Sequence, residues 1–216
     1  MMHEEFVDIY DDDMKRIGSA VKKDVHKLGL WHKSIHCWLF KRENNHKYVL
    51  FQKRAMSKIF MPGYFDVSVA GHYELGEKVS DGFREVNEEF GLDIPNSAWH
   101  YLGIKMDVGL SPNTINREFC EVYFAEHNFN LLDIKMSQRE VDAVVQIDVE
   151  DGKRLFAGEV ESIEVKGIKW NNAHNGDVYS SFIVSQPNFI PRTDSYYAKI
   201  FTIADLYYNG YKYLYI

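Results

Sequence analysis

Three glutamates within five residues are the feature of this sequence that could most directly do chemistry. They are Glu85, Glu88 and Glu89, just before Gly91. Apolar residues in the same segment recur at steps of four, three and four, the period of one helix face: Val79, Phe83, Val86 and Phe90. We therefore expect a helix that buries this apolar face and presents the three carboxylates together on another surface.

The repulsion between carboxylates on such a surface must be offset by a positive charge. Like charges four residues apart destabilise a helix by about 0.2–0.5 kcal/mol, and carboxylates in the last turn before a glycine C-cap oppose the helix dipole. A hard cation such as Mg²⁺ would turn this repulsion into coordination, because it takes carboxylate oxygens and remains open to substrate phosphates. The alternative is an acidic face that only meets water.

The residues around the glutamates favour the metal interpretation. Seven positions between Val67 and Leu92 resemble the Nudix box, in which two glycines enclose a Glu, an Arg-Glu pair and a Glu-Glu pair: Gly71, Glu77, Arg84, Glu85, Glu88, Glu89 and Gly91. Six residues separate Glu77 from Arg84, where the box has seven. The missing residue falls in the loop or the first helical turn, so the spacing of the three glutamates is unchanged and the register must be made up elsewhere.

The resemblance implies an α/β Nudix fold, with mixed β-sheet layers between helices and a box that forms strand, loop and helix. It implies Mg²⁺, or alternatively Mn²⁺, bound by Glu85, Glu88 and Glu89, and hydrolysis of a diphosphate linked to an organic group. The resemblance also gives Arg84 the task of holding Glu85 or Glu77 by an ion pair. From the helical register alone, we expect Arg84 to point away from the three glutamates.

A second stretch resembles the isopentenyl-diphosphate isomerase branch of the Nudix superfamily and its hydrolase relatives. The matching residues are Arg54, Ala55, Met56, Ser57, Lys58, Pro62, Gly63, Gly71 and His72. The resemblance implies that Arg54, Lys58 and His72 bind the substrate, with Arg54 and Lys58 on its diphosphate. Guanidinium and ammonium groups both suit phosphate oxygens. The alternative is that the two cations are ordinary surface residues.

The isomerases also bind a metal through histidines and glutamates, and His32, His72 and Glu118 stand where three of those ligands would. His26 is a looser match, one residue nearer to His32 than the pattern has it. The isomerases carry a catalytic Cys before the Gly-His pair, whereas this chain has Ala70 there. Isomerase activity is therefore disfavoured, because the allylic proton transfers lose one of two partners. We expect Cys120, among apolar strand residues, to be a buried structural thiol.

Hydrolysis needs a carboxylate that takes a proton from the attacking water, and either Glu85 or Glu118 could serve as this base. Two alternatives to a hydrolase stay open. The first is an isomerase that works without the usual Cys, and the second is a catalytically silent binding module of Nudix shape, for which the shortened box is the support.

Composition narrows the class of protein. The chain has 216 residues, a net charge of −7 and two cysteines without metal or disulfide spacing. The charge argues against a nucleic-acid-binding face, and the acidic N-terminus and the lack of a long apolar run indicate a cytoplasmic protein without a membrane segment.

We expect one domain over residues 1–216. Its parts are an N-terminal strand and polar arm over residues 1–30, the box over 67–92 and a Tyr-rich C-terminal extension packed on the domain over 171–216, with Thr193 or Asp194 capping a last helix. An apolar dimer surface on this extension is the alternative. Residues 109–116 are rich in turn formers, and we interpret them as a loop, either on the substrate side or inert.

Overall fold

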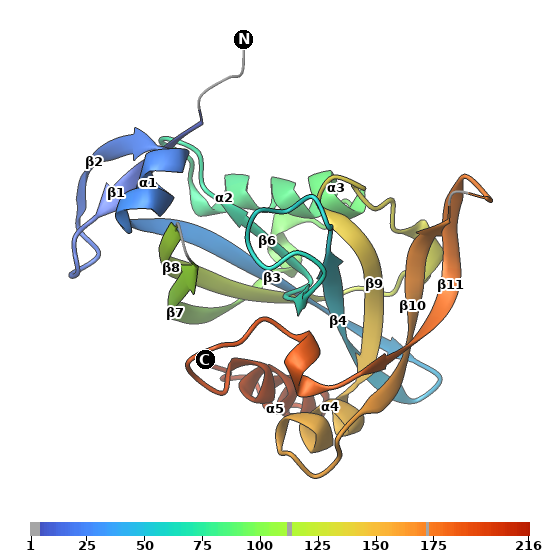
Figure 1. The fold of residues 1–216 in the computed structure, drawn as a ribbon. Coiled ribbons are helices and arrows are strands. Elements are labelled where there is room, and N and C mark those ends of the chain that lie inside the picture. The colour runs from blue at the N-terminus through green and yellow to red at the C-terminus, as the bar shows by residue number, and fades with distance from the viewer. Residues whose placement is uncertain (1–4, 112–113, 172) are drawn as a thin grey trace.

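A computed structural model describes residues 5–111, 114–171 and 173–216, which form a large β-sheet with helices on both sides (Figure 1). The strands are β1 (Phe6–Tyr10), β2 (Arg16–Val21), β3 (Trp31–Glu43), β4 (His46–Arg54), β5 (Phe65–Asp66), β6 (Val69–His72), β7 (His100–Ser111), β8 (Thr114–Glu126), β9 (Val141–Asp148), β10 (Ile163–Asn171) and β11 (Gly176–Val184). The helices are α1 (Lys22–Leu28), α2 (Val79–Gly82), α3 (Arg84–Phe90), α4 (Val149–Phe156) and α5 (Tyr196–Tyr208). The expected α/β architecture with a mixed sheet is confirmed.

The long strand β3 organises the sheet. The main path runs β11-β10-β9-β4-β3-β1-β2, and β6 and β8 also pair with β3, while β7 pairs with β8 and β5 with β4. The pairing of β3 with β8 is parallel and places His32 opposite Glu118, whereas the other strand pairs of the described chain are antiparallel. The strands that carry the expected site residues therefore converge on β3.

Each face of the sheet has its own hydrophobic core, because side chains alternate along a strand. On one face, Ile35 and Leu39 of β3 pack with Val86 and Phe90 of the box helix α3. On the other face, Trp38 and Phe40 pack with aromatic residues of α5, among them Tyr196 and Phe201. Figure 1 shows this division, with α3 on one side of the sheet and α4 and α5 on the other.

The structure departs from the sequence expectations at several elements. The single helix expected over the box is divided into α2 and α3, and Phe83 between them is half-buried and stacks on Trp99 with ring centroids 4.9 Å apart. The polar arm forms β2 and α1, because β2 pairs with β1 as a hairpin. Strands β7 and β8 extend into the expected loop from both sides, and residues 112–113 at its centre lie outside the described residues, as do residues 1–4 of the N-terminal segment.

The C-terminal segment contributes β11 and α5, and α5 packs on α4 and β4. The expected cap of α5 is wrong, since Ser195 occupies the N-cap position without a side-chain hydrogen bond. Asp194 instead pairs with Lys105 at 3.6 Å and with Lys199 at 3.3 Å. None of the described helices is long and apolar enough to cross a bilayer.

A buried ion network joins the segment before α5 to the sheet. Arg192 lies between Asp66 and Asp107, with an Nη2–Oδ1 distance of 2.5 Å to Asp66, and Tyr197 also donates to Asp66 at 3.1 Å. Burial acts to raise the pKa of Asp66, but the charges of Arg192 and Arg54, together with smaller contributions from His36 and a backbone hydrogen bond, hold this pKa below its usual value. The ionised pair therefore depends on both partners being present.

Arg192→Met should lower the free energy of unfolding by about 3–5 kcal/mol near pH 7, because it leaves the buried Asp66 without its ion-pair partner and Asp107 with Lys105 alone. The pKa of Asp66 is lower in the folded state than in the unfolded state, so its contribution is present above the unfolded value and is lost as pH falls through the folded value. The difference between wild type and variant should therefore shrink in acid. Urea denaturation near pH 7 and near pH 3 measures it.

The control for this comparison is Arg154→Met, since Arg154 is an exposed residue of α4 whose side chain is 53% accessible. It should change the free energy of unfolding by no more than about 0.5 kcal/mol. An equal loss of unfolding free energy in both variants would show that the buried ion network stabilises the protein no more than an exposed ion pair does.

The α4–α5 contact requires Gly152. A Cβ built on Gly152 would lie 2.2 Å from Cε1 of the fully buried Phe201. Gly152→Ala should therefore destabilise the protein by about 1–3 kcal/mol despite the higher helix propensity of Ala, as measured by thermal or urea unfolding. Gly176→Ala is the matched control, because the nearest atom to its Cβ is 3.8 Å away. A neutral Gly152→Ala would mean that α5 can shift.

Candidate active site

The loop after β6 brings Glu85 directly over Gly71. β6 pairs with β3, and the chain then turns through residues 73–78 into α2 and α3. A Cβ on Gly71 would lie 2.2 Å from Cδ of Glu85 and 2.4 Å from its Oε1. No residue with a side chain could stand at position 71 without displacing this carboxylate, which explains the first glycine of the motif.

Arg84 holds the loop and the helix together. Its Nε and Nη2 donate to the two carboxylate oxygens of Glu77 at 2.9 and 3.1 Å, Nη1 donates to Glu85 Oε1 at 2.5 Å, and Nη2 donates to the His72 carbonyl at 3.3 Å. The expectation that Arg84 points away from the glutamates is wrong, because its long side chain also approaches Glu88 to 3.5 Å. The shorter box therefore keeps Glu77 in contact with the helix.

The three glutamates of α3 have different surroundings. Glu89 is buried and accepts a hydrogen bond from Gln52 Nε2 of β4 at 3.0 Å, whereas the Glu88 side chain is 58% exposed. At about 100° of rotation per residue, Glu88 and Glu89 diverge to opposite sides of Glu85. The three do not offer oxygens all within 4.8 Å of one another, unlike two other sets among the described residues. The three glutamates therefore do not share one surface as expected, because Glu89 is buried and Glu88 faces solvent.

Burial affects the protonation of this region. Burial raises the pKa of Glu85, opposed by the Arg84 charge. It also raises the pKa of Glu89 well above its usual value, and the nearby Glu85 charge adds to this effect. Gln52 was missed by the sequence analysis, although a polar residue at the end of the apolar run of β4 is the signal that could have indicated it.

The two expected diphosphate cations, Lys58 and Arg54, have different partners. Lys58 forms an ion pair with Glu140, which precedes β9, and its positive charge acts to lower the pKa of Glu89. Arg54 at the end of β4 donates from Nε to the Phe60 carbonyl at 3.1 Å, which shapes the loop between β4 and β5. Both side chains are partly exposed. The structure thus brings Lys58 beside Glu89, while Arg54 is tied to its own loop.

A three-histidine cluster lies at the junction of α1, β3 and β6. It consists of His26, His32 and His72, whose ring centroids are 4.9–5.3 Å apart and whose ligand atoms lie within 4.8 Å of one another. Glu118 of β8 adjoins it, with Oε1 2.9 Å from His72 Nε2 and 3.6 Å from His32 Nε2. The structure therefore joins His26, the looser match, to the three expected ligands.

The donor set of this cluster fits a metal ion. His32 Nε2 is buried without a hydrogen-bond partner, while its Nδ1 lies 3.0 Å from the Leu30 carbonyl, an arrangement typical of metal-binding histidine. Burial acts to raise the pKa of Glu118, but its contacts with His32 and His72 hold the pKa well below the usual value. Burial lowers the pKa of His72 to about 4, which keeps the ring neutral and able to coordinate.

The position of the missing isomerase cysteine lies on β6. Ala70 is opposite His36 of β3 and packs partly buried against the core that contains Trp38. Cys120 on β8 is fully buried, and its Sγ lies 3.5 Å from Glu118 Oε2. The expectation of a buried thiol is confirmed, but its neighbours include charged and polar groups as well as apolar ones.

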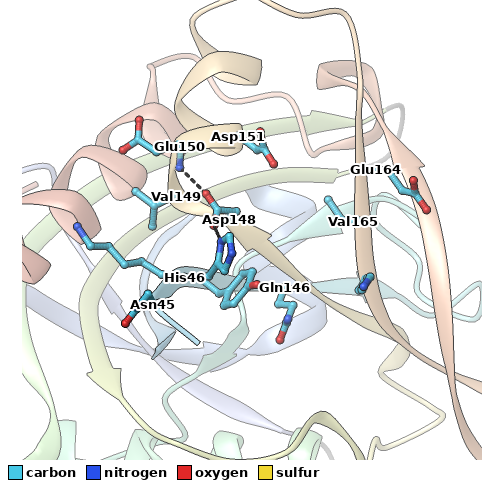
Figure 2. A pocket seen from close by; sticks show the side chains of 12 residues that line it. Asn45, His46, Gln146, Asp148, Val149, Glu150, Asp151, Glu164 and Val165 are labelled. Atoms are coloured by element: carbon cyan, nitrogen blue, oxygen red, sulfur yellow. Dashed lines mark hydrogen bonds and ion pairs between the residues drawn. The ribbon is translucent and has the colours of Figure 1, made fainter. Parts of the chain in front are cut away.

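A separate cavity of about 690 Å³ lies between β4, β9, β10 and the start of α4 (Figure 2). His46 and Asp148 face each other there, with Nδ1 and Oδ2 3.0 Å apart, and Asp148 also accepts from the Glu150 backbone N–H and caps α4. None of the expected site residues is among the twelve that line this cavity. Asp148 therefore has a structural role here, as the N-cap of α4 and the partner of His46.

Comparison with known proteins identifies relatives of the chain. An uncharacterised Nudix hydrolase of Clostridium acetobutylicum is 35% identical over 198 residues, which cover 91% of this chain and 95% of that protein. Isopentenyl-diphosphate Delta-isomerase 2 of Photorhabdus laumondii is 33% identical over 93 residues, 43% of this chain and 51% of that one. No family model matches the chain.

The fold is also similar to that of a solved structure. The crystal structure of DR0079 from Deinococcus radiodurans has a TM-score of 0.54 at 19% identity and covers 71% of this chain and 90% of its own. Together with the glycine, arginine and glutamates of the box and the strand-loop-helix that carries them, the clostridial relative shows that this chain belongs to the Nudix hydrolases, a family that acts on diphosphate-containing substrates.

Proposed function

We propose that the protein hydrolyses a diphosphate that joins phosphate to an organic group, in a Mg²⁺-dependent reaction at the face formed by Gly71, α3 and the end of β4. The observation that carries this proposal is the position of Glu85, which lies against Gly71 and is held there by Arg84 at 2.5 Å. A carboxylate placed by a glycine and a guanidinium has a defined direction, as a metal-dependent site requires.

Glu85, Glu88 and Glu89 would hold Mg²⁺ or Mn²⁺. Glu85 and Glu89 are placed by Arg84 and Gln52, whereas the exposed Glu88 side chain can rotate toward them from its contact with Arg84. The bound ion would neutralise the diphosphate oxygens and lower the pKa of the attacking water. Lys58, which pairs with Glu140, would exchange this partner for a phosphate oxygen of the substrate, and Arg54 would supply a second cation from the end of β4.

We assign the general base to Glu85 rather than Glu118. Glu85 stands at the box face with one oxygen on Arg84, whereas Glu118 already interacts with His72 at 2.9 Å and Ser34 at 3.3 Å. Its position suits a metal ligand of the three-histidine cluster, and we propose that His26, His32, His72 and Glu118 hold a metal ion there. As a ligand of this ion, His72 would act on the substrate through the bound metal and not by direct contact.

Isomerisation of isopentenyl diphosphate is a second candidate, since the three-histidine cluster and Glu118 are the arrangement that the isomerase resemblance implies. Ala70 opposes it, because no thiol stands at that position to carry the second proton transfer. Incubation with isopentenyl diphosphate distinguishes the two. Dimethylallyl diphosphate as product would favour isomerisation, whereas release of phosphate or of a monophosphate would favour hydrolysis.

Glu89→Gln should lower kcat for diphosphate hydrolysis by about 100-fold or more, because it removes a charge that holds the ion while keeping the shape and the contact with Gln52. A panel of organic diphosphates with Mg²⁺, assayed by released phosphate, measures it. Glu150→Gln on α4, an exposed residue paired with Lys153, is the control and should keep full turnover. Equal turnover in both variants would remove Glu89 from the mechanism.

Gly71→Ala should abolish most turnover with a well-formed fold, since the added methyl group occupies the position of the Glu85 carboxylate. Gly18→Ala is the control, because the nearest atoms to its Cβ are 3.8 Å away in Ile9. Circular dichroism and thermal unfolding check the fold, and the same phosphate assay checks activity. An active Gly71→Ala would show that the Glu85 position is not required.

A further inference from the structure

We propose that His36, Glu118 and Cys120 bind a second transition-metal ion such as Zn²⁺, and that Glu118 bridges this ion to the three-histidine cluster. The inference rests on the metal role proposed for Glu118, but the other two ligands, His36 and Cys120, lie outside the three-histidine cluster. Its site lies on the other side of the Glu118 carboxylate, toward the core that contains Trp38 and Tyr196.

The three side chains meet in a small buried space. His36 and Glu118 are 3% and 7% exposed, Cys120 is fully buried, and each offers a ligand atom within 4.8 Å of the others. A parallel register places Ser34 of β3 opposite Cys120 of β8, and His36 follows two residues later on the same face. Adjacent strands thus supply a nitrogen, an oxygen and a sulfur from one side of the sheet.

The two oxygens of Glu118 face different donor groups. Oε1 lies 2.9 Å from His72 and 3.6 Å from His32, in the three-histidine cluster. Oε2 lies 3.3 Å from Ser34 Oγ and 3.5 Å from Cys120 Sγ. A carboxylate with one oxygen in each donor set is placed to bridge two cations, because each oxygen keeps a lone pair for its own ion.

Tyr196 holds the ring of His36 in place. Its Oη lies 2.8 Å from His36 Nδ1 and accepts a hydrogen bond from Trp38 Nε1 at 2.9 Å. In the tautomer that donates Nδ1–H to Tyr196, the lone pair of His36 Nε2 is left for a metal. Metal-binding histidines commonly use their second nitrogen in this way, and the outer partner fixes both ring orientation and tautomer.

The surrounding charges leave Glu118 without a compensating cation. The buried Arg192 is paired with Asp66 and Asp107, and Lys105 is paired with Asp107 at 2.7 Å and Asp194 at 3.6 Å. Within the described residues, Glu118 lies close to the imidazole rings of His32 and His72, and no lysine or arginine is within ion-pair distance of it. A buried carboxylate needs a positive partner, and metal ions in the two donor sets would supply it.

The thiol decides the class of metal. Thiolate and imidazole ligands suit Zn²⁺ and Co²⁺, whereas Mg²⁺ prefers oxygen ligands alone. Binding releases the Cys120 thiol proton to solvent, and the sulfur lone pair forms the new bond. The ion would therefore differ from the Mg²⁺ of the box glutamates, and metal content can distinguish the two.

Titration of the metal-free protein with Co²⁺ tests the proposal. Wild type should show a sulfur-to-cobalt charge-transfer band, and Cys120→Ser should lose this band and bind one fewer Co²⁺ per chain by elemental analysis. Cys37→Ser is the matched control, since Cys37 is an equally buried free thiol that packs in the opposite core with Val86. It should keep both the band and the Co²⁺ content.

Further variants separate this site from its neighbours. His36→Gln retains the thiol and should also bind one fewer Co²⁺, and Tyr196→Phe should weaken binding by about 10–100-fold. His72→Asn should lose the ion of the three-histidine cluster and keep the sulfur band. Thermal unfolding of each metal-free variant confirms that it folds.

A wild-type protein without a sulfur band at saturating Co²⁺, or a Cys120→Ser variant that keeps it, would overturn the second site. The hydrolysis proposal would be untouched by either result, because it is tested by turnover of Glu89→Gln. Conversely, a normal sulfur band in a protein that hydrolyses no diphosphate would support the second site and contradict the hydrolase proposal.

Discussion

The geometry of the Nudix box depends on one guanidinium group, that of Arg84. Arg84 contacts Glu77 in the loop, Glu85 on the helix and the His72 carbonyl at the end of β6, so a single side chain fixes three segments of the box. Glu85 would otherwise stand in a partly buried place beside Glu89 with no positive partner, which is unfavourable for both carboxylates. The guanidinium suits this role because its planar donors can serve several acceptors at once.

The sequence was informative where spacing within one segment decides the outcome. The positions of Gly71 and Glu85 followed from the motif, and so did the burial of Val86 and Phe90 on one helix face. The burial of Glu89 could not be foreseen, because it depends on Gln52, which lies 37 residues away on β4. Side-chain reach was the other limit, since helical rotation alone placed Arg84 on the wrong side.

The three-histidine cluster shows the same distinction between local pattern and tertiary contact. His32 and His72 matched a pattern, but His26 enters the cluster because α1 ends at Gly29 in a left-handed conformation and β3 begins immediately afterwards. The surroundings of Cys120 were equally hidden. Phe119, Val122 and Phe124 give its strand an apolar character, whereas Glu118, two residues before it, and His36 of β3 offer ligand atoms close to its sulfur.

The parallel pairing of β3 with β8 has a consequence for how the protein is made. Ser34 and Glu118 are 84 positions apart in the chain, and the two strands can pair only after the intervening segment has been synthesised and its ends have met. Contacts between such distant segments form slowly, because the entropy of loop closure must be overcome first. A nascent chain that has left the ribosome only as far as the box therefore lacks the contacts that Glu118 makes with His32 and His72, because these can form only after β8 has been synthesised.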